Sequence, residues 1–201
     1  MKTKTDGILL APSFIEEATK FTNQCRKLQI PYVFIDSDIP DQPSLSYIGP
    51  DLYHSGYLAA NLISYLVGGK DRILIVNISA EIENHHHLLR KEDGFRGYFK
   101  EHNITDSIEK IDIRKISYNS IKKEISQALL KYKDIKVLFV TNAKVSFVAQ
   151  YLKEANRGDI VLVGYDFLKE NISYPEEENY NFFDLPETQE SRPYKGIMNS
   201  L

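Results

Sequence analysis

The sequence predicts an α/β protein built on doubly wound parallel sheets, and two observations support that fold class. Short runs rich in Val, Ile and Leu recur along the 201 residues, and continuous apolar runs are typical of parallel strands buried on both faces. Between them lie segments with apolar residues at steps of three and four, as in amphipathic helices. Strands that alternate with helices imply right-handed crossovers and helices on both sheet faces.

Eight hydrophobic runs are the expected strands. In chain order they are residues 7–11, 32–35, 46–48, 73–78, 111–116, 136–140, 160–163 and 180–183. Several of these runs are followed directly by polar residues. Ligand crevices in open α/β sheets lie at the carboxyl ends of the strands, so these polar residues are the first candidates for a binding site.

The helices expected between the strands are marked by apolar stripes. The clearest covers residues 13–29, where Ser13 and Glu16 fit a capping box. Its stripe comprises Phe14, Ala18, Phe21, Cys25 and Leu28. Two later stripes comprise Ile121, Ile125, Ala128, Leu129 and Tyr132, and then Val145, Val148, Ala149 and Leu152. Each of these helices can cover one face of a sheet.

Composition excludes several classes of protein. A net charge of -3 with scattered lysines gives no long-range attraction to nucleic acid. A single cysteine cannot form an internal disulfide, and Cys25 is expected to pack in the core. No stretch approaches the roughly 18 apolar residues that span a bilayer, and the amino-terminal residues show no export signal. We therefore expect a cytoplasmic chain with no membrane partner.

Motifs for catalysis or cofactors are absent from the sequence. It contains no dinucleotide fingerprint, Walker loop or Gly-x-Ser-x-Gly elbow, so we expect neither an enzyme nor a bound cofactor. The three consecutive histidines suggest a metal-binding site as one hypothesis; they are His85, His86 and His87. Consecutive side chains diverge, however, and structural zinc sites bring four ligands, so polar loop residues near a ligand crevice are the preferred interpretation.

Six stretches in order resemble the ligand-binding region of LacI-family transcriptional regulators, which shares its fold with type I periplasmic sugar-binding proteins. They are DGILLAP at 6–12, IPYVFID at 30–36, GYLAA at 56–60 ahead of RILI at 72–75, KEDGF at 91–95, FVTN at 139–142 and VLVGYD at 161–166. The fourth looks like the family's basic-x-x-Gly-Phe signature. Together they extend over nearly the whole chain.

The resemblance implies two similar lobes joined by three crossing segments, with a ligand closed between them. Residues 1–50 then form an incomplete N-terminal lobe, residues 51–185 the C-terminal lobe, and residues 186–201 a return segment. It also implies a sugar or other small polar effector, a homodimer, and operator DNA bound only through a headpiece absent from this chain. An effector-binding domain of a regulator is the leading hypothesis; a periplasmic or extracytoplasmic sugar-binding protein or sensor is the alternative.

The resemblance also implies that particular residues contact the ligand. Asp166 directly follows a strand, where it could accept hydrogen bonds from two hydroxyls or cap the next helix. Asn142 follows another strand and has the same two readings. Lys91 stands where the family usually has Arg, so either Arg90 takes over that role or ligand preference differs, because ammonium and guanidinium bind differently. A solvated helix face remains the alternative for Lys91.

Three weaker candidates complete the expected site: Ser13, which follows the first strand, His87 in the histidine run, and Gln189 near the second expected crossing. Tyr53, Tyr57 and Tyr165 could stack on a sugar ring, although core or interface packing is the ordinary role of Tyr. The missing strands would also leave an unpaired apolar edge beside residues 6–12, which favours association.

Overall fold

The computed structural model describes residues 5–12, 14–39, 41–68, 71–80, 82, 86–104, 108–165 and 182–185. Of these, the residues up to Asp51, with His86 and His87, belong to one compact unit. Those from Leu52 to Ile82 and from Leu88 onward form the other. The return segment expected at 186–201 lies outside the described residues.

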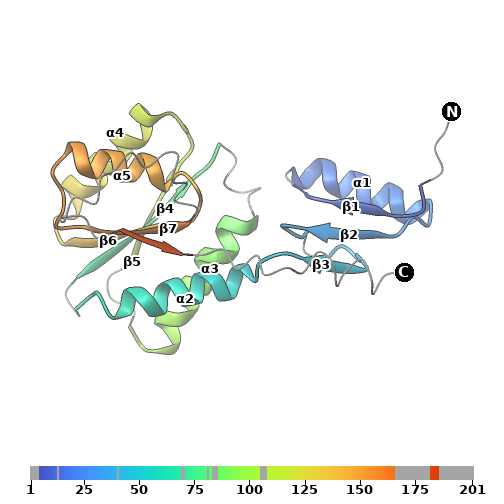
Figure 1. The fold of residues 1–201 in the computed structure, drawn as a ribbon, viewed down its shortest axis with the longest axis horizontal. Helices are drawn as coiled ribbons and strands as arrows, with labels where there is room; N and C mark the ends of the chain where they lie inside the picture. Colours follow the sequence, from blue (N-terminus) through green and yellow to red (C-terminus); the bar gives the residue numbers. More distant parts are fainter. Residues whose placement is uncertain are drawn as a thin grey trace. The chain divides into compact units, whose positions relative to one another are not determined.

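The second unit is a five-stranded parallel sheet between helices (Figure 1). Its strands are β4 (Arg72–Ile78), β5 (Ile108–Ile113), β6 (Ile135–Val140), β7 (Val161–Tyr165) and β8 (Phe182–Leu185), in the order β5-β4-β6-β7-β8. Its helices are α2 (Leu52–Ser64), α3 (His86–Glu101, from Leu88 onward), α4 (Tyr118–Lys131) and α5 (Val145–Glu154). The α/β doubly wound class predicted from the sequence is confirmed.

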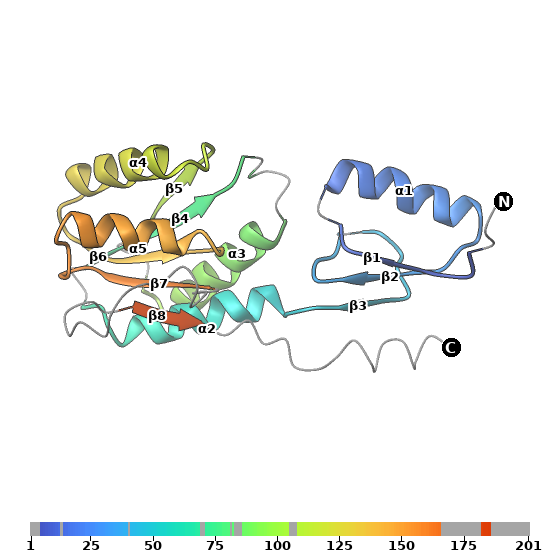
Figure 2. The ribbon, with the colours of Figure 1, turned by 45° about the horizontal axis from the view of Figure 1, so that its top comes forward.

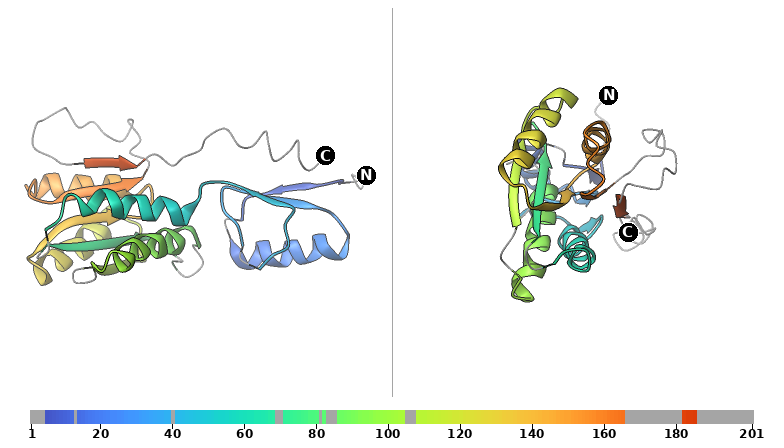
Figure 3. Two further views of the ribbon diagram at one scale, coloured as in Figure 1. Left: turned by 90° about the horizontal axis from the view of Figure 1, so that it is seen from below. Right: turned by 90° about the vertical axis from the view of Figure 1, so that its left-hand side faces the viewer.

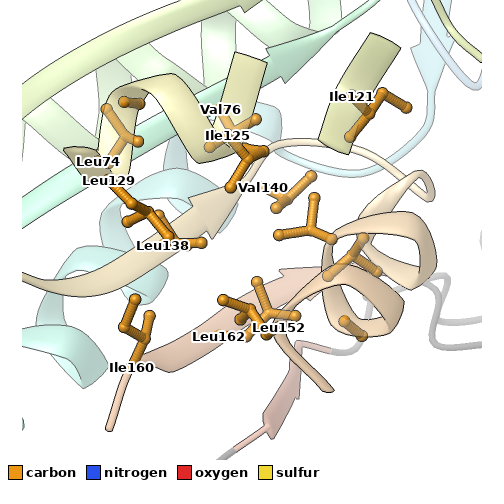
Figure 4. Close-up of a cluster of buried hydrophobic side chains, with 14 of the residues drawn as sticks. Leu74, Val76, Ile121, Ile125, Leu129, Leu138, Val140, Leu152, Ile160 and Leu162 are labelled. Atoms are coloured by element: carbon orange, nitrogen blue, oxygen red, sulfur yellow. The ribbon is translucent and has the colours of Figure 1, made fainter. Parts of the chain in front are cut away.

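Each face of this sheet has its own apolar core, because successive strand residues point to opposite sides. One face packs against α4 and α5 (Figure 4), through Leu74, Val76, Leu138, Val140 and Leu162 from the strands and Ile121, Ile125, Leu129 and Leu152 from the helices. The other face packs against α2 and α3, through Ile73, Ile75, Val137, Phe139 and Val163 with Ala59, Ile63, Phe95 and Phe99. Both helical stripes, at 121–132 and 145–152, pack against the sheet as predicted, with Tyr132 only partly buried.

The strands of this unit that are displaced most from the predicted ranges are β5 and β8, while β7 ends two residues beyond the predicted 160–163. The strand expected at 111–116 is β5, which begins at Ile108 and pairs with β4 from Ile73↔Ile108 to Ile78↔Ile113. Ile116, taken as its end, is half exposed and lies just before α4. The strand expected at 180–183 is β8, which extends to Leu185 because it pairs with β7 as far as Tyr165.

An ion pair joins α4 to α5 on the surface. The Nζ of Lys122 lies 2.7 Å from Oε2 of Glu154, and Gln150 donates to the other oxygen at 3.0 Å. The ammonium of Lys122 is the largest cause that lowers the pKa of the Glu154 carboxyl, from 4.5 to about 2, followed by hydrogen bonds from Tyr118 and Gln150. The folded state therefore favours the charged form of the Glu154 carboxyl more strongly than the unfolded chain does.

This lowered pKa predicts an acid-sensitive contact. A carboxyl with a lower pKa in the folded state stabilises the fold above its unfolded pKa, and that contribution disappears as pH falls from about 4.5 towards 2. Carbon-detected NMR titration should find the Glu154 midpoint near 2, and Lys122→Met should raise it. The control is Lys123→Met, which removes the same charge one residue away. Equal midpoints in the two variants would contradict the assignment.

The first unit is a three-stranded parallel sheet with one helix (Figure 2). Its strands, β1 (Ile8–Leu10), β2 (Tyr32–Ile35) and β3 (Ser46–Ile48), lie in chain order, and α1 (Ile15–Lys27) covers one face. Ala18 and Cys25 of α1 are buried against Tyr32 and Phe34 of β2, so the core role predicted for Cys25 is confirmed.

The start of α1 differs from the prediction. The helix begins at Ile15 instead of near Ser13, and its N-cap residue is Phe14, with no side-chain capping hydrogen bond. Ser13 lies outside the described residues, so its expected ligand contact stays a prediction. Glu16 and Glu17 lie in the first turn, where their negative charges interact favourably with the positive end of the helix dipole.

Apolar side chains are exposed on this small unit. Leu9 of β1 is 54% exposed, and Phe14, Phe21 and Leu28, in and beside α1, are also exposed. Among the described strands, β1 pairs only with β2. An edge strand with unpaired backbone groups and apolar side chains is a template for association.

We therefore expect the 201-residue polypeptide to self-associate. Size-exclusion chromatography with light scattering should show species larger than a monomer, and Leu9→Lys should reduce them because charge on an edge opposes pairing. The matched control is Leu130→Lys on α4, at a side chain that is 72% exposed. A monodisperse, cooperatively unfolding monomer before any substitution would contradict this expectation.

Candidate ligand-binding site

The candidate site lies at the carboxyl ends of the strands of the second unit. The chain leaves β4 towards β5 on one side and returns through β6 to the other side, so the strand order reverses between β4 and β6. Ligands of open α/β sheets bind at such a switch point. The residues at this carboxyl-terminal end of the sheet are Ile78 at the end of β4 with Ser79 after it, Thr141 and Asn142 after β6, and Tyr165 at the end of β7.

Lys91 is the most informative residue at this edge. It belongs to α3 and is 3% exposed, so the alternative of a solvated helix face is wrong. Its Nζ lies 3.7 Å from the centroid of the Tyr165 ring, a cation–π contact. Tyr165 is fully buried and its hydroxyl accepts a hydrogen bond from Ser55 at 3.0 Å. The carboxyl-terminal end of the sheet therefore carries a buried ammonium, that of Lys91, over the aromatic face of Tyr165.

Two glycines bring α3 close enough to α2 to place Lys91 there. The helices lie side by side (Figure 3). A Cβ on Gly56 would lie less than 3.0 Å from the carbonyl oxygen of Lys91, and a Cβ on Gly94 would lie equally close to that of Tyr53. Both glycines belong to stretches that carry the resemblance to a known family. Their role here is close packing of two helices.

Asn142 uses its side chain within the protein. Its Nδ2 donates to the carbonyl of Ile78 at 2.6 Å, and its Oδ1 accepts from the backbone N–H of Lys144 at 3.2 Å. The helix α5 begins at Val145 with Lys144 as its N-cap residue, so Asn142 forms a turn ahead of the helix and is not its cap. Each amide atom can form a second hydrogen bond, so a ligand contact stays a prediction.

Arg90 and His87 lie elsewhere on α3. Arg90 is exposed, and its guanidinium carbon lies 4.8 Å from the centroid of the Tyr53 ring. His87 is the second residue of α3 and is half-buried, so the loop expected for the histidine run has already become helix at His86. Asp166, Gln189 and His85 lie outside the described residues. The ligand roles expected for these residues stay predictions.

Two of the three tyrosines suggested as stacking surfaces, Tyr165 and Tyr57, pack within the protein. Tyr165 presents one face to Lys91 and packs against Phe139 at 6.0 Å between ring centroids. Tyr57 packs edge-on against Tyr98, and its hydroxyl donates to Glu101 at 2.7 Å. That carboxylate raises the pKa of Tyr57, since deprotonation would lose the hydrogen bond.

Sequence reasoning missed four polar residues near this edge. Ser55 donates a hydrogen bond to Tyr165, while Asn77, Glu92 and Thr141 are buried, with Glu92 and Thr141 each hydrogen-bonded to Asn77. Asn77 was hidden inside an apolar run, and Glu92 inside an exposed-looking helical segment. A polar residue within an otherwise apolar strand was the available signal, because a buried amide requires partners.

Other features of the described residues lie apart from this edge. A cavity of about 480 Å³ lies beside α3 and, of the residues suggested as ligand contacts, contains only Tyr53; it is lined by Tyr53, Asp93, Arg96, Gly97, Phe99, Lys100, Ile104 and Ile108. In the part of the chain that the structure describes, no three His, Cys, Asp or Glu side chains are grouped to hold a metal ion. No described helix has the length and apolarity to cross a membrane.

Comparison with known proteins identifies the fold's relatives. Residues 1–190 match the family model described as periplasmic binding protein domain. No curated protein matches the chain. A solved structure from Bacteroides fragilis, assigned as a LacI transcriptional regulator, is 27% identical with a TM-score of 0.78, over 97% of this chain and 68% of that protein.

Two sugar-binding proteins are also similar. GanP, a glucose-galactose binding protein from Geobacillus stearothermophilus, is 25% identical with a TM-score of 0.72, over 85% of this chain and 60% of GanP. A periplasmic sugar-binding protein from Legionella pneumophila shares the fold at 18% identity, with a TM-score of 0.73, over 90% of this chain and 67% of that one. Because the family model matches nearly the whole sequence, the chain belongs to the periplasmic binding protein domain family.

Proposed function

We propose that this chain is the effector-binding part of a LacI-type bacterial regulator whose effector is a sugar or another small polar molecule. The observation that carries the proposal is the buried Lys91 at the carboxyl end of the doubly wound sheet, on the same edge as Asn142. Hydrogen-bonding side chains of this kind can pair with neighbouring hydroxyls of a sugar. The similarity to the Bacteroides fragilis protein over 97% of this chain supports the regulatory role.

In this proposal the protein binds without a chemical step. It works in the cytoplasm as a homodimer, and it contacts operator DNA through a headpiece outside these 201 residues. Ligand binding closes the two lobes, and this closure changes the affinity of the headpieces for DNA. Such coupling requires that the ligand bind the two conformational states with different affinity.

Calorimetry of the full-length protein tests both halves of the proposal. D-Glucose, D-galactose and other monosaccharides are titrated into the protein alone and into its complex with DNA from its own promoter region. We expect one sugar to bind and its affinity to change when DNA is present, since coupling is reciprocal. Binding that is identical with and without DNA would refute the regulatory half, and no binding of any of these monosaccharides would refute a sugar effector.

A periplasmic or extracytoplasmic sugar-binding protein is the second candidate, and the similarity to GanP favours it. It predicts the same sugar binding with a different output. The reading frame upstream of Met1 separates the two candidates: a helix-turn-helix supports the regulator, and a signal peptide supports the exported binding protein.

A further inference from the structure

A buried polar cluster lies beneath α3, beside the candidate site. Its central residue is Asn77 of β4, which is fully buried. The Nδ2 of Asn77 donates to Glu92 Oε2 and to Asp112 Oδ1, both at 3.0 Å, and its Oδ1 accepts from Thr141 at 2.7 Å. One amide therefore ties together α3, β4, β5 and the residue that follows β6.

Glu92 is the member of this cluster that α3 contributes. Its side chain is 9% exposed. While Oε2 accepts from Asn77, Oε1 accepts from Arg96 Nε at 2.8 Å, and the Nζ of Lys110 lies 3.6 Å from Oε2. A buried carboxylate with these partners has strong geometric preferences, because leaving it unpaired costs several times the energy of an ordinary hydrogen bond.

The two candidate ligand residues are sequence neighbours of this cluster. Lys91 precedes Glu92, and Asn142 follows Thr141. At this point α3 is held from two sides, by the close contact of Gly56 with the backbone of Lys91 and by the bonds of Glu92 to the sheet. Adjacent residues of a helix point about 100° apart, so fixing Glu92 against β4 fixes the direction of Lys91.

We propose that Glu92, held by Asn77, is a positioning residue that keeps the ammonium of Lys91 over the ring of Tyr165. Glu92 acts through Lys91 and does not touch the ligand itself. The consequence for ligand binding rests on the proposed function, whereas the position of Lys91 does not. The two parts can therefore be tested separately.

Proton–carbon NMR of the lysine ε-methylene groups in the full-length protein tests the position without any ligand. A methylene over an aromatic face is shifted upfield, and Lys91→Met identifies the signal. We expect Glu92→Leu to return this signal towards the position of solvated lysines, and Glu92→Gln to keep it upfield because Gln still accepts from Asn77. An unchanged upfield signal in a folded Glu92→Leu protein would overturn the proposal.

The matched control is Glu109→Gln, which removes a carboxylate from β5 at the other end of the sheet, where it pairs with Arg72 at 2.7 Å. It should leave the Lys91 signal in place. If Glu92→Leu fails to fold, Glu92→Ser removes the same bonds without placing an apolar side chain among charged neighbours. The same two outcomes then apply.

Calorimetry with D-glucose and D-galactose tests the consequence for binding. For whichever sugar the unmodified protein binds, Glu92→Leu should weaken binding about tenfold, Glu92→Gln should restore most of it, and Glu109→Gln should change little. Equal affinity in Glu92→Leu would show that the position of Lys91 does not matter for the ligand. If neither sugar binds while the NMR signal moves as expected, the positioning role stands and D-glucose and D-galactose are excluded as ligands.

Discussion

Replacing Gly94 with alanine should lower the free energy of unfolding by about 2 kcal/mol or more, because the new methyl group has no space between α3 and α2. Its Cβ would lie less than 3.0 Å from the backbone oxygen of Tyr53, and backbone atoms cannot turn aside as a flexible side chain can. Alanine favours a helix by about 1 kcal/mol over glycine, but that gain is smaller than the cost of separating two packed helices.

Urea denaturation monitored by circular dichroism measures this effect. Gly94→Val should lower stability further, and Gly56→Ala should resemble Gly94→Ala because its Cβ meets the carbonyl of Lys91. The matched control is Gly68→Ala, whose Cβ would lie at an ordinary 3.5 Å from Asp71. If Gly94→Ala is as stable as this control, the helices are not held at the distance that the structure shows.

The fold could be predicted well from the sequence where apolar periodicity is strong. The strands Tyr32–Ile35 and Ser46–Ile48 have the predicted bounds, and the stripes of α4 and α5 are buried. The edge strand β5 was misplaced by three residues, because its sequence mixes Glu, Lys and Asp with isoleucine and its side chains are only partly buried. At an edge, pairing with β4 decides the register, and pairing is not visible in one sequence.

The site was harder to predict because polar side chains do not reveal their burial. Lysine is almost always exposed in proteins, so the amino-acid sequence alone could not show that Lys91 is buried over Tyr165. Asn142 was placed correctly at a strand end, but its bond to the carbonyl of Ile78 joins residues 64 positions apart. Such long-range partners depend on the strand order, which a pattern of local periodicity does not contain.

Replacing Lys91 with methionine should weaken ligand binding about 100-fold, since a buried charged donor contributes about 1.5–3 kcal/mol to each hydrogen bond it forms. This expectation rests on the proposed function. Methionine has similar length and leaves the packing on Tyr165 nearly intact, so the thermal midpoint should change little. Calorimetry of the full-length protein with the sugar it binds measures the first effect, and scanning calorimetry the second.

Two comparison variants separate the causes of such a loss. Lys100→Met removes the same charge from an exposed position of α3 and should leave affinity within about twofold, because exposed charges are screened. Arg90→Met tests whether its exposed guanidinium supplies the contact instead. If Arg90→Met weakens binding and Lys91→Met does not, the cation that meets the ligand is Arg90, and the buried ammonium of Lys91 serves only the packing of α3 on the sheet.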